Sequence, residues 1–213
     1  MSEHNSYTCD TSCRLCNALS KYKNKSFNHC IIETASFVLL PGLGAITEGY
    51  SIIVSKKHVP NMTCFEQEEL HELSRLVEDS KEVISNALGE NTIFTVGEHG
   101  SVPTTENSAG CITHFHLHVF PVSIAVPKEI LDKKHLTISS YKQIKQAPLP
   151  YILIQTHESE IYIVNDDNFP KQYLRKLVAS HLGKPNEWNW KEHLEISRIE
   201  SFLSNLPPQF KSV

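Results

Sequence analysis

The stretch that decides the fold is His114-Phe115-His116-Leu117-His118-Val119-Phe120-Pro121, in which three histidines alternate with large apolar residues before a proline. Side chains two positions apart in an extended strand share one face of the sheet. The pattern therefore predicts a strand with a row of imidazoles on one face and with Phe115, Leu117 and Val119 in a core on the other. Neighbours in such a row stand about 6.5 Å apart, so adjacent histidines can handle one phosphate or one metal ion.

The alternative to a functional row is a half-buried strand whose histidines are solvated or bonded to the backbone. Threonine or serine would fill polar strand positions at a lower desolvation cost and with a better β-propensity. Three histidines in register therefore favour a functional role of the row over a purely structural one.

Apolar runs upstream of the histidines predict further strands at residues 36–40, 50–55 and 92–96, with a turn at Pro41-Gly42-Leu43-Gly44 and a polar loop from residue 97 to 110. Thr63 and Glu66 have the spacing of a capping box, and apolar residues then recur at helical intervals up to Gly89. We expect a helix from residue 64 or 65 to residue 88 that covers the sheet.

The C-terminal part has its own pattern. Residues 151–155 and 161–164 are apolar runs around a short polar turn, which is typical of a hairpin. Helices are expected at about residues 127–134, after Phe169-Pro170, and at about residues 190–206. The sequence predicts an α+β fold, mainly an antiparallel sheet with a long covering helix, in which residues 1–125 form a catalytic domain and residues 126–213 an extension packed on it.

Composition narrows the class of protein. The 213 residues carry a formal charge of −4 and an isoelectric point near 6.3, so no overall basic field recruits nucleic acid or an anionic membrane. No apolar stretch approaches the roughly 20 residues that span a bilayer, and the first residues lack the features of a signal peptide. We therefore expect a cytoplasmic protein whose six cysteines are reduced thiols, some of them at a metal site.

The histidine pattern resembles the signature of the histidine triad superfamily of nucleotide hydrolases and transferases. The resemblance extends to Pro41-Gly42-Leu43-Gly44, Glu48-Gly49-Tyr50 and Lys56-Lys57-His58, and it covers about residues 13–122. It implies a hydrolase that cleaves a nucleoside phosphate linkage, of the dinucleoside polyphosphate or phosphoramidate type, through a phosphohistidine. In that mechanism His116 is the nucleophile, and His118 bonds a phosphoryl or leaving-group oxygen.

Three other functions fit the same residues. A nucleotidyltransferase would pass the nucleotide to another phosphate instead of water. A binding module would hold the nucleotide without turnover. In a zinc hydrolase the three histidines would bind a catalytic metal, although histidines that fan along a strand must curve to meet one ion.

Cys13 and Cys16 have a spacing that suits one tetrahedral zinc ion, although a lone Cys-x-x-Cys is a weak signal. The resemblance implies that His58 and His114 complete a structural zinc site, with Cys9 as the substitute thiolate. The alternative is a metal-free knuckle in which His58 is hydrogen-bonded to His114.

The resemblance also implies a nucleotide pocket beside the triad, with the base near Phe37 and Leu39 and the phosphates against the loop that starts at Glu98. One departure from the family is Ala109-Gly110-Cys111, where many members carry Gly-Gln before the triad. The residues expected to contact substrate besides the histidines are Phe37, Leu39, Glu98, His99, Ser101, Asn107 and Cys111.

Two features of the extension stay open at the sequence level. Arg175 either reaches a substrate phosphate or bonds a carboxylate. The apolar stripe of the last helix is either core or the contact of a homodimer.

Overall fold

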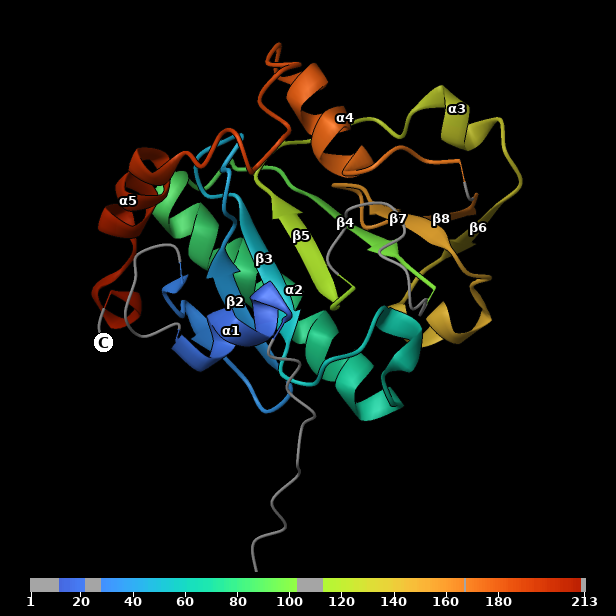
Figure 1. The fold of residues 1–213 in the computed structure, drawn as a ribbon, viewed down its shortest axis with the longest axis horizontal. Helices are drawn as coiled ribbons and strands as arrows, with labels where there is room; N and C mark the ends of the chain where they lie inside the picture. Colours follow the sequence, from blue (N-terminus) through green and yellow to red (C-terminus); the bar gives the residue numbers. More distant parts are fainter. Residues whose placement is uncertain (1–11, 22–27, 103–112, 167, 212–213) are drawn as a thin grey trace, which may run out of the picture.

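The computed structural model describes residues 12–21, 28–102, 113–166 and 168–211, and within them one eight-stranded sheet forms the centre of the molecule (Figure 1). The strand order is β1-β2-β3-β5-β4-β7-β8-β6, and every neighbouring pair is antiparallel. The strands are β1 (Ile32–Glu33), β2 (Phe37–Pro41), β3 (Ser51–Ser55), β4 (Thr95–Gly100), β5 (His116–Phe120), β6 (His135–Ile138), β7 (Tyr151–Gln155) and β8 (Ile161–Asn165). The predicted α+β class with a mainly antiparallel sheet is confirmed.

Helices pack on both faces of this sheet (Figure 1). They are α1 (Arg14–Lys21), α2 (Gln67–Leu88), α3 (Lys128–Leu131), α4 (Tyr173–His181) and α5 (Ile196–Asn205), with 3-10 turns η3 (Met62–Cys64), η5 (Tyr141–Gln146) and η6 (Pro208–Phe210). The last long helix therefore begins later than the sequence suggested, at Ile196 instead of near residue 190.

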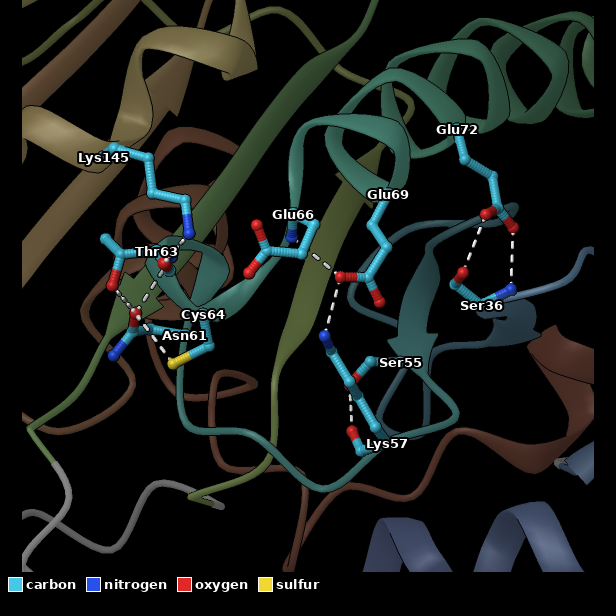
Figure 2. Close-up of polar contacts among 10 residues, drawn as sticks. All are labelled: Ser36, Ser55, Lys57, Asn61, Thr63, Cys64, Glu66, Glu69, Glu72 and Lys145. Atoms are coloured by element: carbon cyan, nitrogen blue, oxygen red, sulfur yellow. Dashed lines mark hydrogen bonds and ion pairs between the residues drawn. The ribbon is translucent and has the colours of Figure 1, made fainter. Parts of the chain in front are cut away.

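The expected long covering helix is α2, but its start differs from the prediction. The backbone N–H of Glu66 donates to the carboxylate of Glu69 at 2.8 Å, so the reciprocal cap is formed by these two residues (Figure 2). Thr63 belongs instead to η3, where its own N–H donates to the Asn61 side chain at 3.0 Å. Asn61 therefore caps a separate turn just before the helix, and Thr63 does not cap α2 as predicted.

The two faces of the sheet belong to different cores. Leu117 and Val119 of β5 pack with the apolar side of α2, which crosses behind the strands in Figure 1. Val38 and Leu40 of β2 pack on the opposite face, against Leu15 of α1. Because successive side chains of a strand point to opposite faces, this assignment also fixes where each histidine of β5 points.

Strand β4 extends further than the sequence suggested. Residues 97–100 were expected to begin a loop, yet β4 continues to Gly100 because β7 pairs along it from Val96 opposite Gln155 to Gly100 opposite Tyr151. The predicted hairpin of β7 and β8 is confirmed, and it continues the same sheet as the histidine strand. A domain division at residue 125 stays a prediction.

No helix in the described part of the chain combines the length and the apolar composition needed to cross a bilayer.

Candidate active site and metal centre

The three histidines lie at the start and along the length of β5. His114 lies two residues before the strand and is fully buried, while His116 and His118 lie within it on one face. The rings of His116 and His118 are 5.0 Å apart between centres and nearly perpendicular, at 78°. The predicted row therefore exists as two neighbouring imidazoles with a third turned away at the strand start.

Backbone carbonyls fix which nitrogen of two of these rings carries a proton. A carbonyl oxygen only accepts, so the ring nitrogen facing it must donate. His114 Nε2 donates to the carbonyl of Ser55 at 2.8 Å, and His116 Nδ1 donates to the carbonyl of His114 at 2.8 Å. The lone pair of His114 is therefore on Nδ1, and the lone pair of His116 is on Nε2.

The third ring is oriented by a tyrosine. The hydroxyl of Tyr50 lies 2.6 Å from His118 Nδ1, and both side chains are buried. Burial raises the pKa of Tyr50, and the guanidinium of Arg175, which lies 5.3 Å from the centre of the Tyr50 ring, only partly opposes this, so the phenol keeps its proton and can donate it to Nδ1. With Nδ1 of His118 accepting, its Nε2 carries the proton.

Burial keeps these imidazoles neutral. It lowers the pKa of His114 to about 4 and lowers the pKa of His116 and, more strongly, of His118. The positive charge of Arg175 acts in the same direction on the pKa of His116 and His118. Neutral imidazole is the form that acts as a nucleophile or as a metal ligand.

Four side chains with metal-binding atoms meet beside the row. They are Cys13, Cys16, His58 and His114, and their ligand atoms all lie within 4.8 Å of one another. Cys13 lies just before α1 and Cys16 within it, while His58 follows β3. Helix α1 thus brings two residues from the N-terminal segment to the strand that carries the histidines.

The geometry of this cluster fits a tetrahedral metal ion. The Sγ atoms of the two cysteines lie 3.4 and 3.5 Å from His114 Nδ1, and Cys16 Sγ lies 3.2 Å from His58 Nδ1. Zinc bound to sulfur at about 2.3 Å and to nitrogen at about 2.05 Å separates such ligands by about 3.5 Å. The bond from His114 Nε2 to Ser55 orients the ring so that its lone pair faces the thiols, as metal-binding histidines require.

A cavity opens on the histidine face of the sheet, and we call it the histidine cavity. His99, His116 and His118 line one side of it. Its other walls come from β2, β3, α1 and the C-terminal segment: Arg14, Leu15, Leu40, Tyr50, Ile52, Tyr173, Leu174, Arg175 and Trp190 are among them. The cavity therefore combines apolar walls with polar groups that converge on the triad, as small-molecule sites do.

Several residues expected at this pocket lie elsewhere. Phe37 and Leu39 have no exposed surface and belong to the core beneath α2, so Leu40 and Pro41 supply the cavity wall from β2 instead. Glu98 points to the same core, where its carboxylate accepts from the Tyr151 hydroxyl at 2.6 Å and from the backbone N–H of Met62 at 2.9 Å. The physical reason is the alternation of a strand, which puts each of these residues on the opposite face from its neighbour.

The remaining predicted residues divide into three cases. His99 lines the cavity, and burial lowers its pKa. Ser101 follows β4 and does not line the histidine cavity; its backbone carbonyl accepts from the Asn61 side chain at 2.7 Å. Cys9, Asn107 and Cys111 lie outside the described residues.

The sequence did not identify several cavity residues. Arg14 follows Cys13 directly in the sequence, and Tyr50 lies in Glu48-Gly49-Tyr50, a segment that resembles the histidine triad superfamily. Their position in the sequence could therefore have indicated both residues. Arg175 lines the cavity and does not bond a carboxylate within the described part of the chain: its Nε donates to the carbonyl of Trp188 at 2.7 Å, and its Nη2 donates to the carbonyl of Gly44 at 2.6 Å. It therefore joins the extension to the turn after β2.

We compared the chain with known proteins. No protein-family model matches it, and no curated protein matches it by sequence. Among solved structures, a hypothetical histidine triad nucleotide-binding protein from Sulfolobus tokodaii is 18% identical with a TM-score of 0.32, over 44% of this chain and 59% of that one. The chain thus spans less than two thirds of that protein.

Two further solved structures are similar at low identity. A protein from Streptococcus mutans is 15% identical with a TM-score of 0.36, over 53% of this chain and 66% of that one. A Hit-like protein involved in cell-cycle regulation from Bartonella henselae is 16% identical with a TM-score of 0.41, over 58% of this chain and 90% of that one. Two of these three solved structures are described as histidine triad or Hit-like proteins, and both are less than 20% identical to this chain.

Proposed function

We propose that the protein is a histidine triad nucleotidyl hydrolase, which cleaves a nucleoside phosphate linkage through a phosphohistidine on His116. One observation carries the proposal: the bond from His116 Nδ1 to the carbonyl of His114 leaves the lone pair on Nε2, in a ring that lines the histidine cavity. Burial keeps this ring neutral. The cytoplasmic location and a homodimer stay predictions.

The reaction has two displacements. In the first, the lone pair of His116 Nε2 forms a bond to the phosphorus, while the bond from phosphorus to the leaving group breaks and its electron pair leaves with that group. In the second, water attacks the same phosphorus, the phosphorus–nitrogen bond breaks, and the electron pair returns to Nε2. The proton lost by water goes to the solvent, and the product is a nucleoside monophosphate.

His118 acts on the oxygens of the reacting phosphate. Its Nε2–H lies on the same face as the nucleophile and can donate to a phosphoryl or leaving-group oxygen, where negative charge grows in the transition state. Tyr50 orients this ring through its 2.6 Å contact with Nδ1. His116 and His118 thus present different neutral tautomers to the cavity, which suits them to different tasks.

Cys13, Cys16, His58 and His114 would hold zinc in a structural role. When bound, the ion supplies a fixed point that holds α1 against β5 and sets the ring of His114. No ligand position is left for substrate when four protein atoms coordinate the ion, which argues against a catalytic zinc here.

The mechanism is tested by trapping. Purified protein is mixed with an adenosine nucleotide labelled in the α-phosphate, quenched and denatured, and the protein-bound label is mapped by mass spectrometry. We expect label on His116 in the wild type and none in His116→Ala. Nucleotide release without any protein-bound label would contradict the proposal. Faster release of nucleotide products on adding phosphate or a sugar phosphate would identify a transferase.

The metal site is tested separately. Elemental analysis should find one zinc per chain, and Cys16→Ser should remove it and lower the melting temperature by about 5 °C or more. Cys64→Ser is the matched control, because Cys64 lies outside the cluster and should change neither quantity. Metal-free wild-type protein with unchanged melting would remove the site.

A further inference from the structure

Two arginines from opposite ends of the chain line the histidine cavity. Arg14 opens α1, beside the metal cluster, and Arg175 belongs to α4 in the C-terminal extension. They meet around one segment: the Arg14 guanidinium lies 4.3 Å from the centre of the Trp190 ring, and Gly44 packs against both Trp190 and Arg175. The two cations therefore share one side of the cavity.

Arg175 is held in place but not saturated. Only 3% of its surface is exposed, and its Nε and Nη2 donate to two backbone carbonyls. Its Nη1 is buried and has no hydrogen-bond partner within the described part of the chain. Leaving a buried charged donor without an acceptor is unfavourable, so the position suits a residue that receives its acceptor from a ligand.

Neither arginine forms an ion pair with a carboxylate in the described ranges, and no aspartate or glutamate of those ranges lines the cavity. The cavity therefore has two guanidinium groups and three imidazoles in a protein with a formal charge of −4. The field inside the cavity is opposite in sign to the charge of the whole chain, which favours a ligand with several negative charges.

One phosphate does not use all of these groups. In the proposed mechanism the attacked phosphate lies against His116 and His118, which leaves the two arginines without an anion. We infer that Arg14 and Arg175 form a second anion subsite that holds a phosphate of the substrate other than the one attacked. This inference rests on the proposed function for the position of the first phosphate.

The subsite assigns a substrate class. A nucleoside with two or more linked phosphates gives the arginines an anion while His116 attacks the phosphate nearest the nucleoside. A phosphoramidate with a neutral or cationic amine as leaving group does not. Arg14 and Arg175 thus select phosphoanhydrides over phosphoramidates, and the extension supplies half of this selection.

The inference is tested by binding, without turnover. The probes are adenosine 5′-monophosphate and the α,β-methylene analogue of adenosine 5′-diphosphate, whose carbon bridge resists cleavage, and calorimetry gives both Kd values. We expect the wild type to prefer the diphosphate analogue by about tenfold or more. Arg14→Met and Arg175→Met should each reduce this preference to less than about threefold, with the Kd of the monophosphate changed by less than about threefold.

Arg198→Met is the matched control. Arg198 also reaches from the extension to backbone carbonyls of the same turn, those of Ala45 and Ile46, but it does not line the cavity. It should keep the wild-type preference. If circular dichroism finds Arg175→Met unfolded, Arg14→Met alone decides, since the Arg14 side chain packs only on Trp190 among the described aromatic rings.

The outcomes separate this inference from the mechanism. A wild type without a preference for the diphosphate analogue, or a folded Arg14→Met that keeps it, overturns the subsite. A failed phosphohistidine trap together with a lost preference in the variants removes the mechanism and leaves the subsite. A labelled His116 together with an unchanged preference for the diphosphate analogue in both variants supports the mechanism and removes the subsite.

Discussion

The two faces of the central sheet bury polar groups in opposite ways. On the α2 face, both carboxyl oxygens of Glu98 are in hydrogen bonds, one with the Tyr151 hydroxyl and one with the backbone N–H of Met62. On the cavity face, His116 and His118 each have one ring nitrogen in a hydrogen bond, and the other ring nitrogen has no hydrogen bond within the described residues. Burial alone therefore does not mark the site, whereas ring nitrogens that open onto a cavity without a hydrogen-bond partner do.

The largest expected effect is a loss of turnover when a histidine of the cavity face is removed. His116→Ala should lower the turnover of a cleaved nucleotide at least about a hundredfold, because it removes the group that forms the covalent intermediate. The free energy of unfolding should change by less than about 1 kcal/mol, since His116 is half-buried at the cavity wall. Steady-state kinetics and urea unfolding measure the two quantities.

The matched control for that variant is His135→Ala. His135 lies on β6 of the same sheet and is exposed, so its removal should leave both turnover and stability near wild type. A His116→Ala protein that retains more than about a hundredth of the wild-type rate would remove the nucleophile assignment.

Leu117, the next residue along β5, tests the opposite face of the sheet. Leu117 is fully buried in the core beneath α2, so Leu117→Ala should lower the free energy of unfolding by about 2–5 kcal/mol. The folded protein at low temperature should keep its turnover within a few-fold. Equal losses of stability in Leu117→Ala and His116→Ala would show that the two faces do not differ as described.

The local sequence pattern was sufficient to predict the elements in which apolar and polar residues recur with a clear period. The row at His116 and His118, the long helix and the β7–β8 hairpin all follow from periodicity within a few residues. Strand β2 has no such alternation, because all of its residues from Phe37 to Pro41 are buried. The sequence therefore could not tell which of its side chains face the cavity, and Phe37 and Leu39 were placed on the wrong face.

Other features depend on partners far along the chain. Glu98 was expected in a loop near the phosphates, because only pairing with β7 keeps β4 extended past Gly97. The cavity wall from Arg14, Arg175 and Trp190 requires the packing of both ends of the chain on the sheet. By contrast, the cluster of Cys13, Cys16, His58 and His114, which could hold a metal ion, was predicted from spacing and family resemblance, since each residue lies in a short recognisable segment.

The smallest expected effect concerns the saturated carboxyl on the α2 face. Burial raises the pKa of Glu98 to about 8, and the hydrogen bonds from Tyr151 and Met62 only partly oppose this. The ordinary value of 4.5 applies in the unfolded chain, so between these two values the folded protein holds a proton that the unfolded protein has lost. The stability from this group is complete below the unfolded pKa and falls as the pH rises toward the folded pKa.

Glu98→Gln should remove this pH dependence. The amide cannot ionise, its oxygen can still accept from Met62, and its nitrogen can donate to the Tyr151 oxygen. Between pH 6 and 7 the wild type should lose about 1 kcal/mol of unfolding free energy relative to the variant. Urea unfolding of both proteins at the two pH values, with the metal content matched, measures the difference.

Glu72→Gln is the control, because the Glu72 carboxylate accepts from the backbone and hydroxyl of Ser36 at 2.7 and 2.8 Å (Figure 2). Burial acts to raise the pKa of Glu72, but the hydrogen bonds of Thr34 and Ser36 and the charge of Lys56 outweigh it and lower the pKa, so the group stays ionised in both states above pH 6. Its removal should therefore not change the slope of stability with pH in this window. If Glu98→Gln also keeps the wild-type slope, the carboxyl of Glu98 is ionised in its core, and complete pairing is enough to hold a buried charge on that face.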